Sequence, residues 1–219
     1  MPPAETGKTL IQCDFDGTIT EEDMGFMLMD IFVGSKEWRK LLVQYHKNEI
    51  SVGPFNTKAF SMLKEDRKTL VNFIKSKVKV RSGFQALLDY CSKENFRFFI
   101  VSNGLDFYIE TILQHIGISG ISAASAQTRF TQSGIEARYI DHEGNLLDQG
   151  FKESYVKMFR KRGYRVIYIG NGESDVAPAK LAHHIFACDN LRDYCREQKI
   201  AHTPFTDFND VIKGLKKLK

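Results

Sequence analysis

Four short apolar runs recur along this chain, and glycine or polar residues follow each of them. The runs cover residues 10–13, 98–101, 166–169 and 185–187. Runs of this length, rich in β-branched and aromatic residues, are typical of buried parallel strands. Helical patterns over 83–94, 106–115 and 152–162 lie between them. The alternation predicts an α/β fold with helices on both faces of a parallel sheet, where ligands bind at the carboxyl ends of the strands.

Two stretches depart from this alternation. Residues 21–80 contain no clear strand and carry apolar side chains at helical spacing. They predict a helical domain inserted after the first strand, so that residues 1–20 and 81–219 form the core domain. Residues 135–147 predict a small β-hairpin with Gly144 at its turn.

Composition excludes several classes of protein. The chain has 219 residues, 42% of them hydrophobic, and a net charge of +4, which is an ordinary globular composition. Only the tail 213–219 is strongly basic, so we expect no nucleic-acid partner, although a nucleic-acid-binding module is a third possible function. No apolar run approaches the roughly 18–20 residues of a membrane helix, so no membrane partner is expected. The polar residues 1–8 and the scattered cysteines, of which Cys13 and Cys188 are predicted to be reduced core thiols, indicate a cytoplasmic protein.

Two acidic residues follow the first apolar run, in the segment Asp14-Phe15-Asp16-Gly17-Thr18. Residues i and i+2 of a strand share a face, so Asp14 and Asp16 project together. Two carboxylates this close repel each other unless a cation joins them or one is protonated. One could attack phosphorus while the other protonates the leaving group. Gly17 permits a turn, and the Thr18 hydroxyl is available to a phosphate.

This segment resembles motif I of the haloacid dehalogenase superfamily, and three further segments occur in the order of that family. Ser102-Asn103-Gly104 after the second strand is similar to motif II. Lys152 at the start of a helix is similar to motif III, and residues 170–175 after the next strand are similar to motif IV. The resemblance implies a Rossmann-like core, with residues 21–80 as a C1-type helical cap.

The resemblance also implies roles for individual residues. Asp14 would be the nucleophile that forms an aspartyl-phosphate, and Asp16 the general acid and then the base. The phosphate would be bound by Thr18, Ser102, Asn103, Gly104 and Lys152. The implied cofactor is Mg2+, with Asp14, Asp16, Asn171 and Asp175 as its ligands. These positions imply a phosphoric monoester hydrolase acting on a small-molecule phosphate ester.

Motif IV departs from the family pattern, because Asn171 stands where the family usually has aspartate. An asparagine offers a side-chain oxygen without the formal charge. We expect either weaker Mg2+ binding or a larger electrostatic contribution from Asp175. A catalytically weakened protein that binds a phosphorylated metabolite is the alternative.

The helical insert and the hairpin are similar to the phosphoserine-phosphatase-like branch of the superfamily. Segments 104–107, 195–198 and 202–208 resemble the MtnX-type phosphatases of methionine salvage, which act on 2-hydroxy-3-keto-5-methylthiopentenyl 1-phosphate. In phosphoserine phosphatases an acid follows the nucleophile by nine positions, as Asp23 does here, but their cap arginine has no match, and Lys58 or Ala59 stands near its place. Asp23 and Lys58 are therefore candidate substrate contacts. A neutral metabolite is favoured over phosphoserine, which remains the alternative, and the sequence leaves the oligomeric state open.

Overall fold

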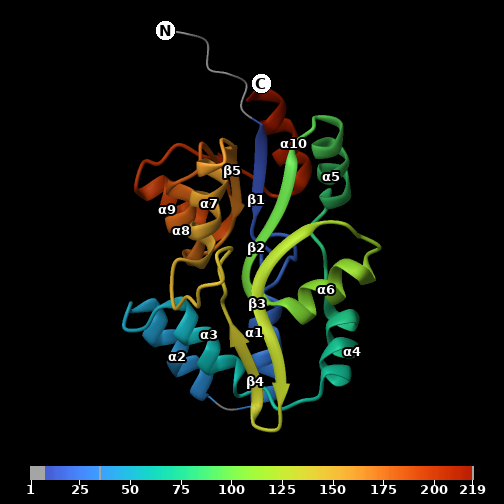
Figure 1. Cartoon of the computed structure of the whole chain (residues 1–219), viewed down its shortest axis with the longest axis vertical. Coiled ribbons are helices and arrows are strands. Elements are labelled where there is room, and N and C mark those ends of the chain that lie inside the picture. The colour runs from blue at the N-terminus through green and yellow to red at the C-terminus, as the bar shows by residue number, and fades with distance from the viewer. Residues whose placement is uncertain (1–7, 35, 219) are drawn as a thin grey trace.

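The computed structural model describes residues 8–34 and 36–218, and these form a seven-stranded sheet with the order β4-β3-β2-β1-β5-β6-β7. All neighbouring strands are parallel except β3 and β4. The predicted α/β fold class is therefore confirmed, with β1 at the centre of the sheet (Figure 1). The strands are β1 (Thr9–Cys13), β2 (Arg97–Leu105), β3 (Ser122–Thr131), β4 (Gly134–Arg138), β5 (Arg165–Gly170), β6 (His184–Ala187) and β7 (Thr203–Pro204).

Helices cover both faces of the sheet, because each parallel connection crosses over it. Figure 1 shows one group of helices on each side of the strands. One face carries α5 (Phe84–Lys93), α6 (Asp106–His115) and α10 (Phe208–Lys217), and the other carries α7 (Phe151–Lys161), α8 (Val176–Lys180) and α9 (Asp189–Glu197). Leu10, Ile11 and Cys13 of β1 are at most 1% exposed, which places the core along this central strand.

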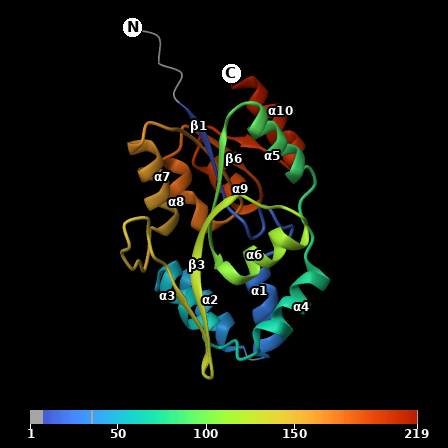
Figure 2. The same cartoon turned by 45° about the vertical axis from the view of Figure 1, so that its right-hand side comes forward.

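Residues 21–80 are helical, with both ends of the segment held together. Thr20 and Val80 form an antiparallel bridge, and the Arg81 N–H donates to the Ile19 carbonyl at 2.8 Å. Figures 1 and 2 show the helices of this segment at the end of the molecule away from the C-terminus. They are α1 (Met24–Leu28), the π-helical η1 (Met29–Val33), α2 (Glu37–His46), α3 (Val52–Phe60) and α4 (Arg67–Lys77).

The hairpin lies earlier in the chain than predicted. β3 and β4 form the antiparallel ladder, with their turn at residues 132–133 rather than at Gly144. The region around Gly144 contributes a single bridge between Ile140 and Leu146. The reason is local, because the Asp141 carboxylate accepts hydrogen bonds from two backbone N–H groups of its own loop and closes it tightly.

Two expectations concern the termini and the cysteines. Residues 1–7, on which the expectation about a leader segment rests, lie outside the described residues. Within the described part of the chain, no helix is both long and apolar enough to span a bilayer. All four cysteines are free and buried, which confirms the prediction of reduced core thiols for Cys13 and Cys188.

Candidate active site

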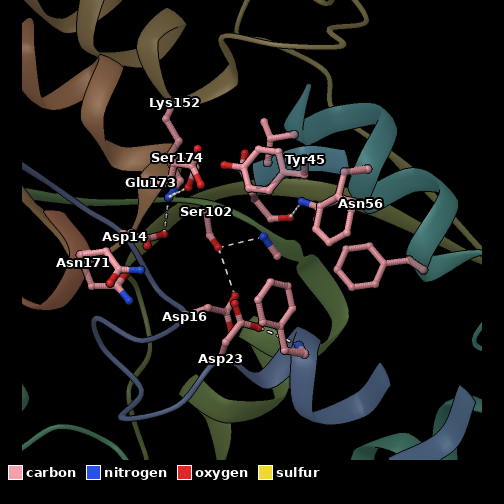
Figure 3. A pocket seen from close by; sticks show the side chains of 18 of the residues that line it. Asp14, Asp16, Asp23, Tyr45, Asn56, Ser102, Lys152, Asn171, Glu173 and Ser174 are labelled. Carbon is pink, nitrogen blue, oxygen red and sulfur yellow. Dashed lines mark hydrogen bonds and ion pairs between the residues drawn. The ribbon is translucent and has the colours of Figure 1, made fainter. Parts of the chain in front are cut away.

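A cavity of about 240 Å³ lies between the carboxyl ends of the central strands and the helices of residues 21–80. Figure 3 shows side chains from both sides pointing into it. The side of the sheet contributes Asp14, Asp16, Ser102, Asn103, Gly104, Tyr108, Lys152, Asn171, Gly172, Glu173, Ser174 and Asn190. The helical segment contributes Asp23, Phe26, Tyr45, His46, Val52, Phe55, Asn56 and Phe60. Most of the predicted site residues therefore meet in one cavity.

Lys152 lies at the centre of a buried charge cluster. Its Nζ is 2.7 Å from Asp14 Oδ1 and 2.7 Å from Asp175 Oδ1, and all three side chains are at most 7% exposed. The start of α7 is held against β1 because Gln12 Nε2 donates to the Lys152 carbonyl at 2.9 Å. Burial lowers the pKa of Lys152, but the two carboxylates raise it more, so its net shift is upward and the ammonium persists.

Asp175 supports Lys152 from behind the cavity. Its Oδ1 also accepts from the Tyr168 hydroxyl at 2.6 Å, and its Oδ2 accepts from the N–H groups of Asn171 and Gly172 at 3.0 and 2.9 Å. Burial raises the pKa of Asp175, but Lys152 and these donors outweigh it, so the net shift is downward. Asp175 is fully buried and does not line the cavity, so Asn171 is the one of the two predicted motif IV metal ligands that reaches the site.

Asp14 is buried beside a second carboxylate, that of Asp175, and shares the one ammonium of Lys152 with it. Burial, and then the nearby Asp175, raise its pKa to about 8, against the opposing effect of Lys152. Lys152 holds Oδ1, while Oδ2 has no hydrogen-bond or ion-pair partner among the described residues. One ammonium thus serves two carboxylates, and the free oxygen of Asp14 is available to a cation or to an electrophile.

Asp16 is held by donors on both of its oxygens. The Met24 N–H donates to Oδ1 at 3.0 Å, the Tyr108 hydroxyl donates to Oδ2 at 2.5 Å, and Ser102 Oγ lies 3.5 Å from Oδ2. Burial, and then the charge of Asp23, raise the pKa of Asp16 to about 7. A carboxyl group that titrates near neutral pH can both give and take a proton, as a general acid and base must.

The motif II segment is fixed by contacts from two other parts of the chain. The Gly104 N–H donates to Ser102 Oγ at 2.9 Å, within the irregular end of β2. The Asn103 carbonyl accepts from the Tyr139 hydroxyl at 2.5 Å and from Asn56 Nδ2 at 3.2 Å. Asn56 belongs to α3, so the helical segment directly contacts the loop predicted to bind phosphate.

Thr18 and Lys58 occupy other places than the sequence suggested. Thr18 is fully buried, and its hydroxyl donates to Asn171 Oδ1 at 3.1 Å instead of facing the cavity. Gly17, with φ +70°, lies beneath the same amide, and a Cβ there would be 2.2 Å from Asn171 Nδ2. This loop therefore positions Asn171. Lys58 is exposed on α3 outside the cavity, whereas Asp23 lines it.

Sequence reasoning missed the aromatic wall and the polar rim of the cavity. The rings of Tyr45 and Phe55 stack at 5.3 Å between centroids, with Phe26 edge-on to Phe55 at 6.2 Å. At the rim, His46 Nδ1 lies 2.9 Å from Glu173 Oε2, which joins α2 to the motif IV loop. The apolar spacing of residues 21–80 marked such side chains as buried, but burial in a core and lining of a cavity give the same pattern.

The donor atoms at the site fit a hard divalent cation. They are the free Oδ2 of Asp14, the backbone carbonyl of Asp16, which accepts no hydrogen bond from the described residues, and the side-chain oxygen of Asn171. Mg2+ prefers oxygen ligands and keeps several waters. This set carries one formal negative charge, and within the described residues no group of three histidine, cysteine or acidic side chains is arranged to hold a metal.

Comparison with curated proteins finds similar chains along nearly the whole length. A protein of Lysinibacillus sphaericus named 2-hydroxy-3-keto-5-methylthiopentenyl-1-phosphate phosphatase is 32% identical, over 96% of this chain and 95% of its own. A protein of Geobacillus kaustophilus with the same name is 31% identical, over 98% of both chains.

Among solved structures, a phosphoserine phosphatase described as a phospho-aspartyl intermediate analogue aligns with a TM-score of 0.73. It covers 95% of this chain and 99% of its own at 17% identity, which shows a common fold. The haloacid dehalogenase-like hydrolase family matches residues 11–180, the span from β1 to α8 that holds every predicted motif. The chain therefore belongs to the haloacid dehalogenase-like hydrolases.

Proposed function

We propose that this hydrolase cleaves the phosphate monoester of a small metabolite through an aspartyl-phosphate on Asp14. The supporting observation is the arrangement of Asp14, Asp16, Ser102 and Lys152 around one cavity, where one oxygen of Asp14 has no partner among residues 8–34 and 36–218. A free carboxylate oxygen beside a buried ammonium is what nucleophilic attack on a phosphoryl group requires.

The reaction takes place in two steps. The Asp14 oxygen attacks phosphorus as the bond to the leaving oxygen breaks, and Asp16 gives its proton to that oxygen. Asp16, now a carboxylate, takes a proton from water, whose oxygen attacks phosphorus and releases inorganic phosphate and Asp14. Lys152 offsets the negative charge of the phosphoryl group and of Asp14, and the Ser102 hydroxyl supplies a further donor.

Mg2+, when bound, supplies electrostatic stabilisation of the phosphoryl oxygens, and Asp14, the Asp16 carbonyl and Asn171 are the residues that would hold it. We further propose that residues 21–80 act as a cap on the core formed by 1–20 and 81–219. The aromatic wall, Asp23 and Asn56 belong to this segment, which closes the cavity and limits access of water to the phosphoenzyme.

The cavity favours a substrate with a neutral, partly apolar remainder. No arginine is among the described residues that line it, and its one lysine is engaged by Asp14 and Asp175. Within the described part of the chain, a carboxylate on the substrate would meet Asp23 and no spare lysine or arginine in this cavity. The substrate named for the relatives carries keto, hydroxyl and methylthio groups, and sulfur makes favourable contacts with aromatic rings such as Tyr45 and Phe55.

We therefore propose a phosphorylated intermediate of methionine salvage as the substrate. We also propose that the reaction takes place in the cytoplasm, and the four free cysteines, which stay reduced there, support this. A panel of small phosphate esters tests this proposal. Esters with an uncharged carbon chain or thioether are expected to be hydrolysed with a kcat/KM about tenfold or more above that of phosphoserine. A difference of this size is expected when a charged group of one substrate has no partner in the site.

Removal of divalent metal with a chelator shows how much of the hydrolysis in the same panel depends on metal. EDTA is expected to stop hydrolysis, and added Mg2+ is expected to restore it. Equal or faster turnover of phosphoserine would favour the phosphoserine phosphatase alternative and contradict the neutral-substrate proposal. Absence of turnover with every ester, at millimolar Mg2+, would contradict the enzymatic proposal as a whole.

Asn171 supports a second candidate function, a protein that binds a phosphorylated metabolite and turns it over weakly. Its carboxamide provides a metal ligand without charge, and Asp175 cannot compensate because Lys152, Tyr168 and two N–H groups occupy its oxygens. Asn171→Asp is expected to lower the Mg2+ dissociation constant measured by calorimetry by about tenfold, as a second charge in a site of intermediate dielectric should.

The catalytic rate decides between the two candidates. A modest gain in kcat at saturating Mg2+ would favour the enzyme, whereas activity that appears only in Asn171→Asp would favour the binding protein. Exposed Asn145→Asp, in the loop at 141–145, is the matched control and is expected to leave the Mg2+ affinity unchanged. Unchanged Mg2+ affinity in Asn171→Asp would show that residue 171 does not contact the ion.

A further inference from the structure

We propose that Tyr108 is a positioning residue that holds Asp16 in the orientation from which it protonates the leaving group. The inference rests on the proposed phosphatase function and adds a residue that none of the four motifs contains. Tyr108 belongs to α6, on the turn of helix that follows motif II, and its hydroxyl reaches the second acid of motif I, 92 positions away in sequence.

The contact geometry supports a positioning role. The Tyr108 hydroxyl donates to Asp16 Oδ2 at 2.5 Å, while the Met24 N–H donates to Oδ1 at 3.0 Å. The carboxyl group is thus clamped between a side chain of the core and the first turn of α1. The only other contact to either oxygen within the described residues is Ser102 Oγ at 3.5 Å, which is too long to orient the group alone.

The surrounding backbone is shaped to admit this hydroxyl. Tyr108 is fully buried, and Gly104 leaves the space through which its oxygen reaches Asp16. A Cβ at position 104 would lie 2.0 Å from the Tyr108 hydroxyl and 2.5 Å from Asp16 Oδ2. The phenol is therefore enclosed by protein, with its hydroxyl directed past Gly104 to Asp16, and a buried hydroxyl with a fixed path orients its acceptor strongly.

The chemical consequence depends on the leaving group. In the first step the Asp16 proton moves to the leaving oxygen as its bond to phosphorus breaks. A simple alkoxide is too basic to leave without that proton, whereas 4-nitrophenolate leaves readily without it. Loss of Tyr108 should therefore impair the hydrolysis of alkyl phosphates and spare that of 4-nitrophenyl phosphate. A general structural defect would impair both equally.

The test compares kcat/KM of Tyr108→Phe with that of the wild type on one alkyl phosphate from the panel and on 4-nitrophenyl phosphate. This constant covers the steps up to the aspartyl-phosphate, where the leaving group departs. We expect a fall of about 10- to 100-fold for the alkyl ester, part of the 10²–10⁴-fold that a positioned general acid contributes, and a fall below about threefold for the aryl ester.

Two controls isolate the role of Tyr108. Asp16→Asn should show the same preference for the aryl ester, and adding Tyr108→Phe to it should cost little more, since both changes act through one carboxyl group. Tyr90→Phe removes a hydroxyl from a buried tyrosine of α5 that does not line the cavity, and it should leave both constants unchanged.

The ratio of the two constants does not depend on the folded fraction, so partial unfolding of a variant leaves the test intact. Equal falls for both esters, or additive losses in the double variant, would overturn the positioning role. A wild-type chain that hydrolyses neither ester would instead refute the proposed function, and the inference with it. Those two failures are therefore distinguished by the wild-type measurement alone.

Discussion

Asp14→Asn is expected to lower kcat with the best ester of the panel by at least about four orders of magnitude, as removal of a covalent nucleophile does in other enzymes. The amide has nearly the shape of the carboxylate but is a poor nucleophile. It keeps an oxygen toward Lys152, so the fold should persist, and Asp175 still neutralises the ammonium. Steady-state kinetics and thermal unfolding measure the two expectations.

The aspartyl-phosphate can be observed directly as well. Rapid quenching of the wild type with substrate should add one phosphoryl group to the intact mass, and Asp14→Asn should show none. Asp89→Asn, on the exposed face of α5, is the matched control and should retain full activity. Substantial turnover by Asp14→Asn would contradict the assignment of Asp14 as the nucleophile, whatever the effect of the substitution on stability.

Lys152→Met is expected to cost both activity and stability. Methionine fills a similar volume but leaves Asp14 and Asp175 buried, 7% and 0% exposed, without their cation. Removing one partner from a buried ion pair typically destabilises a protein by about 3–5 kcal/mol. Denaturant unfolding at pH 7 should report a loss of this order, together with a fall in kcat/KM of at least about 100-fold, since a preorganised donor near the phosphoryl group is lost.

The loss of stability in Lys152→Met should increase as the pH rises. Burial raises the pKa of Asp175, and Lys152 is the largest influence that lowers it, so the pKa of Asp175 rises when Lys152 is lost. The pKa of Asp14 is raised to about 8 in the wild type as well, so Asp14 adds little to the difference over this range. The folded variant then binds a proton that the unfolded chain has already released above about pH 4. Its stability deficit should therefore be smaller at pH 5 than at pH 8. Lys157→Met, exposed on the same helix, should show no such deficit. A deficit independent of pH would argue against the charge cluster as its cause.

The predicted secondary structure was accurate where the pattern is local. The runs at 10–13 and 166–169 lie within β1 and β5, and the helix predicted at 106–115 coincides with α6. These elements bury a complete face, so period and length identify them. The hairpin was misplaced, because residues 135–138 pair with β3 rather than with residues 146–147. A period of two shows which face of a strand is buried but does not identify its partner.

In the candidate site as well, local pattern predicted some residues and left others unpredicted. Asp14 and Asp16 could be predicted from the strand pattern, and Ser102 and Lys152 from their resemblance to the family motifs. All four meet because strand ends and a helix start lie at one edge of the sheet. Asp175 belongs to the motif that follows β5 at the same edge of the sheet, but the direction of its side chain could not be predicted from the sequence. Its position in a short 3-10 turn aims it at Lys152 and Tyr168 rather than at the cavity.

The amino-acid sequence by itself determined the α/β architecture, the helical character of residues 21–80 and the acids that follow β1, because hydrophobic period and chain order encode them. Only the tertiary structure decided which side chains meet across elements, such as Tyr108 with Asp16 and His46 with Glu173, separated by 92 and 127 positions. Such contacts depend on how each helix is rotated and docked against the sheet. That rotation is set by the packing of all the surrounding side chains together, and no local pattern records it.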